Sequence, residues 1–142
     1  MNPSTSLVPA VGRLLLALLF LISGFGKLAA PEATMGYIGM VGLPLPQIAY
    51  AVALLIELGG GILLLVGFQT RAVALVLAVF SLVTALSFHF DFGDQNQMVH
   101  FLKNIAITGG FLQVFAFGAG SFSLDARLAA DKPAIAGASA RG

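Results

Sequence analysis

The sequence predicts an all-α integral membrane protein, a four-helix bundle with both termini in the cytoplasm. The 142 residues are 58% hydrophobic and only 9% charged, with a mean hydropathy of +0.99. Soluble domains average roughly 45–50% apolar and about 25% charged residues. Four stretches are long and apolar enough to cross a hydrocarbon core about 30 Å thick. Their apolar residues run on without the period-two alternation of a membrane β-barrel, which favours helices.

The four spans are expected at about residues 11–28, 48–68, 72–90 and 98–117. With the segment 31–46 they form one transmembrane domain, residues 1–128. This segment is half apolar and interrupted by glycines and prolines, so we expect it in the membrane interface. Residues 129–142 are rich in Ala and Gly and are expected to form a flexible C-terminal tail. A cleaved signal peptide is the alternative for the first span, but Lys27 stands where a cleavage region prefers small neutral residues.

Basic residues predict the orientation. With four spans, both termini share one side of the membrane. That side carries five basic residues, Arg13, Arg71, Arg127, Lys132 and Arg141, whereas the other side carries Lys27 and Lys103. The termini are therefore expected in the cytoplasm, and the loop 91–97 on the outer side. A net charge of +1 offers no basic surface for nucleic acid. The absence of cysteine excludes disulfides and thiolate metal sites.

Glu57 is the most informative residue, because it lies near the middle of the second span, roughly 15 Å from either end. An ionised side chain there costs at least a few kcal/mol on insertion scales. It must therefore face the bundle interior, pair with a cation or stay protonated. Lys27 near the outer end of the first span and Lys103 in the fourth span are the candidate partners, since lysine stems can reach along a helix axis.

Each predicted helix contributes a polar or ionisable group to the outer half of the bundle: Lys27, Glu57, His89, and Lys103 with Asn104. We predict that these residues line a common polar cavity that binds a polar ligand, a quinone headgroup or a proton. The alternative is a buried ion pair that only fixes helix register. No metal site is predicted, because His89 and His100 lack a third ligand.

Arg13, Arg71 and Asp125 are predicted to have structural roles at the cytoplasmic end. In one interpretation the arginines anchor the protein to lipid headgroups. In the other, the segment 123–125 folds back and its carboxylate pairs with Arg13 or Arg71.

Seven short motifs in fixed order resemble the DoxX family, and together they cover nearly the whole chain. They are Arg13-Leu-Leu-Leu-Ala-Leu-Leu-Phe20, Ser23-Gly-Phe-Gly-Lys27, Ile56-Glu57-Leu-Gly-Gly-Gly61, Gly67-Phe-Gln-Thr-Arg71, Phe88-His89, Phe101-Leu-Lys103-Asn104 and Ser123-Leu-Asp125. The resemblance implies a four-helix protein of the bacterial inner membrane. The family takes its name from a subunit of a terminal quinol oxidase and thiosulfate:quinone oxidoreductase complex, but the name does not confer an activity on this chain. The resemblance assigns no catalytic residue.

Three functions are compatible with these observations. The favoured one is an accessory or quinone-binding subunit of a membrane redox complex. There Lys27 or Lys103 would stabilise charge on a quinone oxygen, Glu57 would relay a proton, and a partner subunit would carry the redox centre. The second is a small transporter or proton-coupled carrier that works as a homo-oligomer. The third is a structural or assembly factor with no turnover, so whether the protein is an enzyme stays open.

Overall fold

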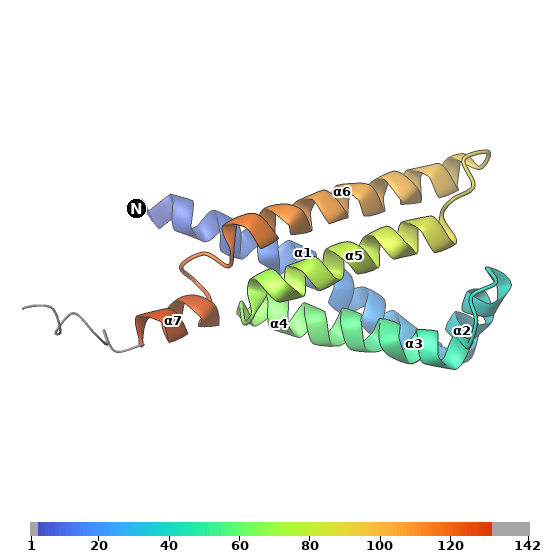
Figure 1. Ribbon diagram of the computed structural model, residues 1–142, viewed down its shortest axis with the longest axis horizontal. Coiled ribbons are helices and arrows are strands. Elements are labelled where there is room, and N and C mark those ends of the chain that lie inside the picture. The colour runs from blue at the N-terminus through green and yellow to red at the C-terminus, as the bar shows by residue number, and fades with distance from the viewer. Residues whose placement is uncertain (1–2, 132–142) are drawn as a thin grey trace, which may run out of the picture.

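The computed structural model describes residues 3–131, and in this part of the chain all regular secondary structure is helical (Figure 1). The elements are α1 (Pro3–Ala29), α2 (Pro31–Met40), α3 (Pro46–Leu54), a π-helical turn η1 (Leu55–Gly59), α4 (Gly60–Val66), α5 (Thr70–Phe88), α6 (Gln95–Phe117) and α7 (Leu124–Ala130). The prediction of an all-α membrane fold is confirmed. Of the predicted tail, residues 129–130 form the end of α7, and residues 132–142 lie outside the described part.

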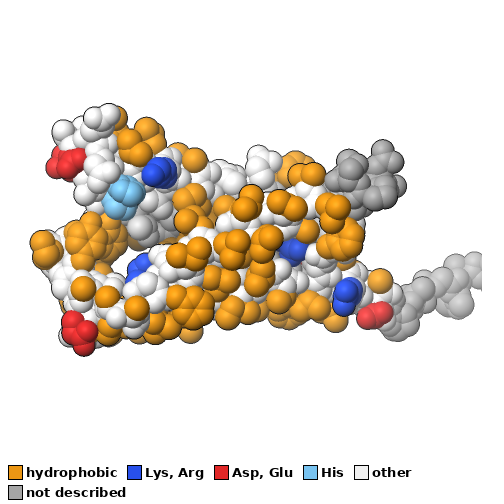
Figure 2. All heavy atoms as spheres, turned by 180° about the vertical axis from the view of Figure 1, so that it is seen from behind, with side chains coloured by type: hydrophobic (Ala, Val, Ile, Leu, Met, Phe, Trp, Pro, Cys, Tyr) orange, Lys and Arg blue, Asp and Glu red, His pale blue; other side chains and the backbone are white. Residues whose placement is uncertain are grey.

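Three helical segments are long and apolar enough to cross a membrane. They are Leu7–Ala29, Pro46–Val66 and Thr70–Phe88, with mean hydropathies of 2.1, 2.2 and 2.1. They coincide with the first three expected spans. The 23-residue α6 occupies the place of the fourth, but its polar first half keeps it out of this group. Leu, Val and Ile side chains cover the outer surface, as expected of helices that face lipid (Figure 2).

Local sequence signals account for most helix boundaries. Pro31 and Pro46 begin α2 and α3, where the fixed proline φ suits the first helical turn. Gly67 ends α4 in the left-handed conformation, with φ +70°. The Asp94 carboxylate caps α6 by accepting hydrogen bonds from the backbone of the first turn. Pro31 thus starts a ten-residue helix within the segment 31–46, which was expected to lie in the membrane interface.

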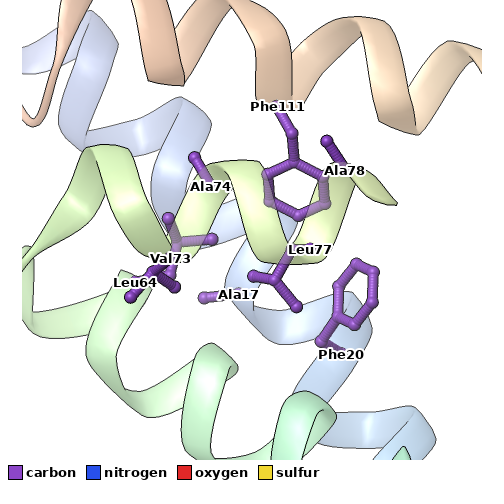
Figure 3. Packing of buried hydrophobic residues seen from close by; sticks show 8 residues of the cluster. All are labelled: Ala17, Phe20, Leu64, Val73, Ala74, Leu77, Ala78 and Phe111. Atoms are coloured by element: carbon purple, nitrogen blue, oxygen red, sulfur yellow. The ribbon is translucent and has the colours of Figure 1, made fainter. Parts of the chain in front are cut away.

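A small buried core joins four helices (Figure 3). It consists of Ala17 and Phe20 of α1, Leu64 of α4, Val73, Ala74, Leu77 and Ala78 of α5, and Phe111 of α6. The Phe20 and Phe111 rings meet edge to face with centroids 5.4 Å apart. A Cβ atom on Gly60 would lie 3.1 Å from Leu77 Cδ2, and one on Gly61 2.9 Å from Leu21 Cδ2. These glycines therefore allow close helix packing.

Beyond this core the bundle divides into two arms (Figure 1). The first arm contains α2, α3 and the C-terminal half of α1. The second contains the C-terminal half of α5 and the N-terminal half of α6. We call this end of the molecule the α2 end, and the opposite end, where the chain turns from α4 into α5, the α7 end. Residues of both arms line a cavity at the α2 end.

Candidate functional site

The centre of the candidate site is an ion pair between Lys27 of α1 and Glu57 of η1. The Lys27 Nζ atom lies 2.9 Å from Glu57 Oε1 and 2.9 Å from Oε2. It also donates to the Ser23 hydroxyl at 2.8 Å. Glu57 is only 4% exposed. An ammonium has three N–H groups, so all three donors of Lys27 have an acceptor within the protein.

The local sequence explains how α1 and η1 come close enough for this pair. Ser23 precedes Lys27 by one helical turn, so both side chains lie on one face of α1. Gly24 opens the space between the helices, because a Cβ atom there would lie 2.6 Å from Leu58 Cδ2 and 3.3 Å from Glu57 Cβ. On the neighbouring helix, the Tyr50 hydroxyl donates to the Lys27 carbonyl at 3.2 Å.

The turn that carries Glu57 is itself unusual. Residues 55–59 form a π-helical turn between two α-helical segments. Such turns occur mostly as single insertions within α-helices, often at functional sites. It ends where the tightly packed pair Gly60 and Gly61 begins.

A cavity of about 1240 Å³ lies between the two arms, and Glu57 and Lys27 form part of its wall. All five residues predicted to line a common cavity do line it: Lys27, Glu57, His89, Lys103 and Asn104. The rest of the wall is mostly apolar, with a short polar row of Ser81, Thr84 and Ser87 on α5. Figure 2 shows the hollow with blue side chains on both of its sides and a pale blue histidine near its mouth.

The second arm contributes a histidine pair to this cavity. The rings of His89 and His100 are stacked with centroids 5.0 Å apart. His89 Nδ1 lies 2.7 Å from Gln97 Oε1, and Asn104 Nδ2 donates to the His100 carbonyl at 3.0 Å. The sequence singled out His89 for the cavity but not His100, although His100 precedes Asn104 by one helical turn. Among the described residues, no cluster of three metal-ligating side chains occurs.

Lys103 lines the same cavity without the partners that Lys27 has. The single ion pair among residues 3–131 is Lys27–Glu57, and Lys103 makes no hydrogen bond within that part of the chain. Of the two lysines that could partner Glu57, the structure therefore selects Lys27. Lys103 shares the wall of the cavity with Asn104 and the histidine pair.

At the α7 end, the segment 123–125 folds back as expected, but its carboxylate does not bind an arginine. Asp125 Oδ1 accepts from the Gln69 amide at 2.8 Å, and Oδ2 accepts from the Thr70 amide at 2.9 Å. The expected pairing with Arg13 or Arg71 is thus wrong, because the N–H groups at the start of α5 bind the carboxylate instead.

Several opposing effects act on Asp125. Partial burial by itself raises the pKa of this carboxyl, whereas the hydrogen bonds from Thr70 and Gln69 and the positive charge of Arg13 lower it. The lowering effects prevail, so the pKa of Asp125 lies below its usual range.

Arg13 is buried at the same end of the molecule, with 3% exposure. Its Nη2 donates to the Phe122 carbonyl at 2.6 Å and its Nη1 to the Leu64 carbonyl at 3.3 Å. Arg13 therefore ties α1 to the end of α4 and to the segment before α7. Arg71, in contrast, is exposed and lies against Gly118.

Comparison with known proteins gives three named relatives and one family. The DoxX family model matches residues 8–90. The chain is 38% identical over 115 residues to "Inner membrane protein YqjF" of Escherichia coli (strain K12). This alignment covers 81% of this chain and 87% of that protein. It is 34% identical over 122 residues to "Inner membrane protein YphA" of the same strain, covering 82% of this chain and 87% of the relative.

A third relative is "Putative oxidoreductase CatD" of Bacillus subtilis (strain 168). It is 34% identical over 79 residues, covering 56% of this chain and 58% of that protein. No solved structure matches this chain.

Proposed function

This chain belongs to the DoxX family of membrane proteins, and from that premise we propose that it is a quinone-binding accessory subunit of a redox complex in the bacterial inner membrane. Two relatives are named as inner membrane proteins, and a third bears the name "Putative oxidoreductase CatD". The observation that carries the proposal is the cavity of about 1240 Å³, whose apolar wall contains a buried ion pair.

The proposed topology has four spans and cytoplasmic termini. With 23 residues, α6 is about 35 Å long at 1.5 Å per residue, which is enough to cross a hydrocarbon core. Its polar residues Lys103 and Asn104 line the cavity, which spares them from facing lipid. Four spans place both termini on the more basic side, which the positive-inside rule assigns to the cytoplasm. Reporter fusions to the C-terminus test this orientation.

The chemistry of the cavity suits a quinone. A quinone combines an apolar isoprenoid chain with a ring that bears two carbonyl acceptors. Apolar side chains dominate the cavity wall and would pack against the chain, while the two ammonium groups in the wall, those of Lys27 and Lys103, are the candidate donors to a ring carbonyl. Glu57 supplies a group that can hold a proton beside the ligand. When bound, the quinone would supply the electron-carrying chemistry, and a partner subunit would exchange electrons with it.

The test is to purify the full chain in mild detergent and measure the bound quinone and copurifying proteins by mass spectrometry. Glu57→Gln keeps the shape of the side chain but removes its charge, and we expect it to reduce bound quinone at least fivefold. Asp131→Asn, at an exposed position beyond α7, is the matched control and should carry the wild-type amount. Wild-type protein with no more quinone than an unrelated membrane protein would refute the proposal.

One observation favours a second candidate, a structural or assembly factor. All three donors of Lys27 are already satisfied by Ser23 and Glu57, as expected of a pair that serves only to fix helix packing. In that case Glu57→Gln would lower thermal stability, and wild-type and variant protein would copurify with the same partners and with no quinone.

A further inference from the structure

We propose that Lys103, and not Lys27, is the cation that binds the ligand headgroup, and that the cavity selects lipid-soluble ligands whose headgroup is anionic or rich in electron density. This inference rests on the proposed role of the cavity as a ligand site. Either lysine could in principle bind the headgroup, and we assign them different roles. Lys27 binds Glu57, and Lys103 binds the ligand.

Lys27 is already fully engaged. Its Nζ atom contacts Ser23 Oγ and both oxygens of Glu57 at 2.8–2.9 Å. A ligand oxygen at Lys27 would have to displace one of these acceptors. Displacing Glu57 would leave a carboxylate that is only 4% exposed without its counter-ion, which is strongly unfavourable. Lys27 is therefore a poor headgroup donor.

The balance of charges in the cavity wall indicates that Lys103 binds the headgroup. The charged side chains of the described wall are Lys27, Lys103 and Glu57. Since Glu57 neutralises Lys27, one positive charge remains. The other acids of the described chain do not line this cavity, and three of them are bonded elsewhere: Asp91, Asp94 and Asp125. A positive charge in a mostly apolar cavity attracts an electron-rich oxygen more strongly than it would in water.

The surroundings of Lys103 complete a polar corner. Asn104 also lines the cavity, and its amide nitrogen is occupied by the His100 carbonyl at 3.0 Å. Its side-chain oxygen can accept a hydrogen bond from another group. His89 is held in place by Gln97 at 2.7 Å. A headgroup with an acceptor oxygen for Lys103 and a hydroxyl for Asn104 would match this corner.

The cavity is also open toward the bilayer. Val52 of α3 and Val76 and Val79 of α5 line it, yet they are 48%, 51% and 54% exposed. Side chains that belong to the cavity wall and are half exposed indicate that the wall is incomplete between α3 and α5. A ligand that is dissolved in the membrane can therefore reach the cavity from the side.

The experiment uses the full chain in lipid nanodiscs and measures equilibrium binding of three probes. Decylubiquinone represents a quinone, dodecanoate an anionic amphiphile, and dodecanol its uncharged counterpart. We expect dodecanoate to bind at least tenfold more tightly than dodecanol. Lys103→Met should weaken binding of dodecanoate and decylubiquinone at least tenfold, whereas Lys103→Arg should stay within about threefold of wild type. Arg127→Gln removes an exposed cation at the α7 end and should change nothing.

The outcomes separate this inference from the quinone proposal. Wild-type binding of either probe by Lys103→Met would overturn the inference, and so would equal binding of dodecanoate and dodecanol. Binding of dodecanoate through Lys103 without binding of decylubiquinone would support the inference and refute the quinone proposal. If the wild-type protein binds neither probe, both fail. Circular dichroism of each variant shows that the helices are retained.

Discussion

The Lys27 ammonium lies 2.9 Å from both carboxylate oxygens of Glu57, a residue 30 positions later in the chain. The pair connects α1 to a π-helical turn in the middle of the second membrane-spanning segment. Removing both ions from water is costly, and their mutual attraction compensates only while both are present. Each residue is therefore expected to depend on the other.

The first prediction tests this dependence with a double-mutant cycle. Lys27→Met leaves the Glu57 charge buried and unpaired, and should destabilise the protein by about 3–5 kcal/mol. Lys27→Met combined with Glu57→Leu removes both charges and should recover most of that loss. Reversible unfolding in mixed micelles of SDS and mild detergent measures the free energies. If the losses of stability in the single variants Lys27→Met and Glu57→Leu add up to the loss in the double variant, the two residues do not act as a unit.

The second prediction concerns the close approach of α1 and η1. Gly24→Ala places a methyl group 2.6 Å from Leu58 Cδ2 and next to Glu57, so either the Leu58 side chain must move or the helices must separate. We expect a loss of about 1–3 kcal/mol, as for other overpacked interiors. Gly26→Ala is the matched control two residues away, because a Cβ atom there meets nothing within 4 Å. It should be neutral or stabilising by up to about 1 kcal/mol.

If Gly24→Ala is as stable as Gly26→Ala, helix propensity, and not packing against Leu58, governs the stability of this region. The thermal midpoint in detergent distinguishes the cases, and loss of bound ligand in Gly24→Ala alone would link the close approach to the cavity.

Hydropathy alone predicts the fold class because lipid imposes one local rule on every span. A segment that crosses the bilayer must satisfy its own backbone groups, so a long apolar stretch becomes a helix. The expected spans at 11–28, 48–68 and 72–90 therefore match the three segments that meet the criteria in the structure. Glu57 stood out for the same reason, since a charge in such a segment needs shelter.

What the sequence could not decide depends on how the helices pack against each other. Lys27 and Lys103 were equivalent candidates for Glu57, and only the approach of α1 to η1, made possible by Gly24, favours Lys27. The partners of Asp125 are backbone N–H groups. Because every residue except proline carries such a group, the sequence does not indicate which ones bind the carboxylate.

The third prediction addresses Arg13. Arg13→Met removes the hydrogen bonds to the carbonyls of Leu64 and Phe122, and charged donors of this kind each contribute about 1.5–3 kcal/mol. We expect the segment 118–131 to open more often, so its amides should exchange with deuterium at least tenfold faster. Amides in the core of α5 should be much less affected. Arg71→Met is the control, since Arg71 is exposed at the same end. Unchanged exchange in Arg13→Met would show that α7 is held by other contacts.

The fourth prediction concerns the pH dependence that Asp125 confers. Its pKa is lower in the folded protein than in the unfolded chain, so the folded state binds this proton more weakly. The stabilisation is therefore complete well above the unfolded carboxyl pKa of about 3.9 and is lost as the pH falls through that value toward the lower folded pKa.

At pH 7, Asp125→Asn should lower the stability by about 1 kcal/mol, because Asn has one side-chain oxygen and one of the two N–H groups, of Gln69 or Thr70, loses its acceptor. Between pH 6 and pH 3.5 the thermal midpoint of the wild type should fall by more than that of Asp125→Asn, because the variant has no carboxylate to protonate at this position. Asp131→Asn, which removes an exposed carboxylate just beyond α7, should follow the wild type. Parallel pH profiles for the wild type and Asp125→Asn would contradict the assignment of Asp125 as the cap of α5, since every other acidic group in the chain is common to both proteins.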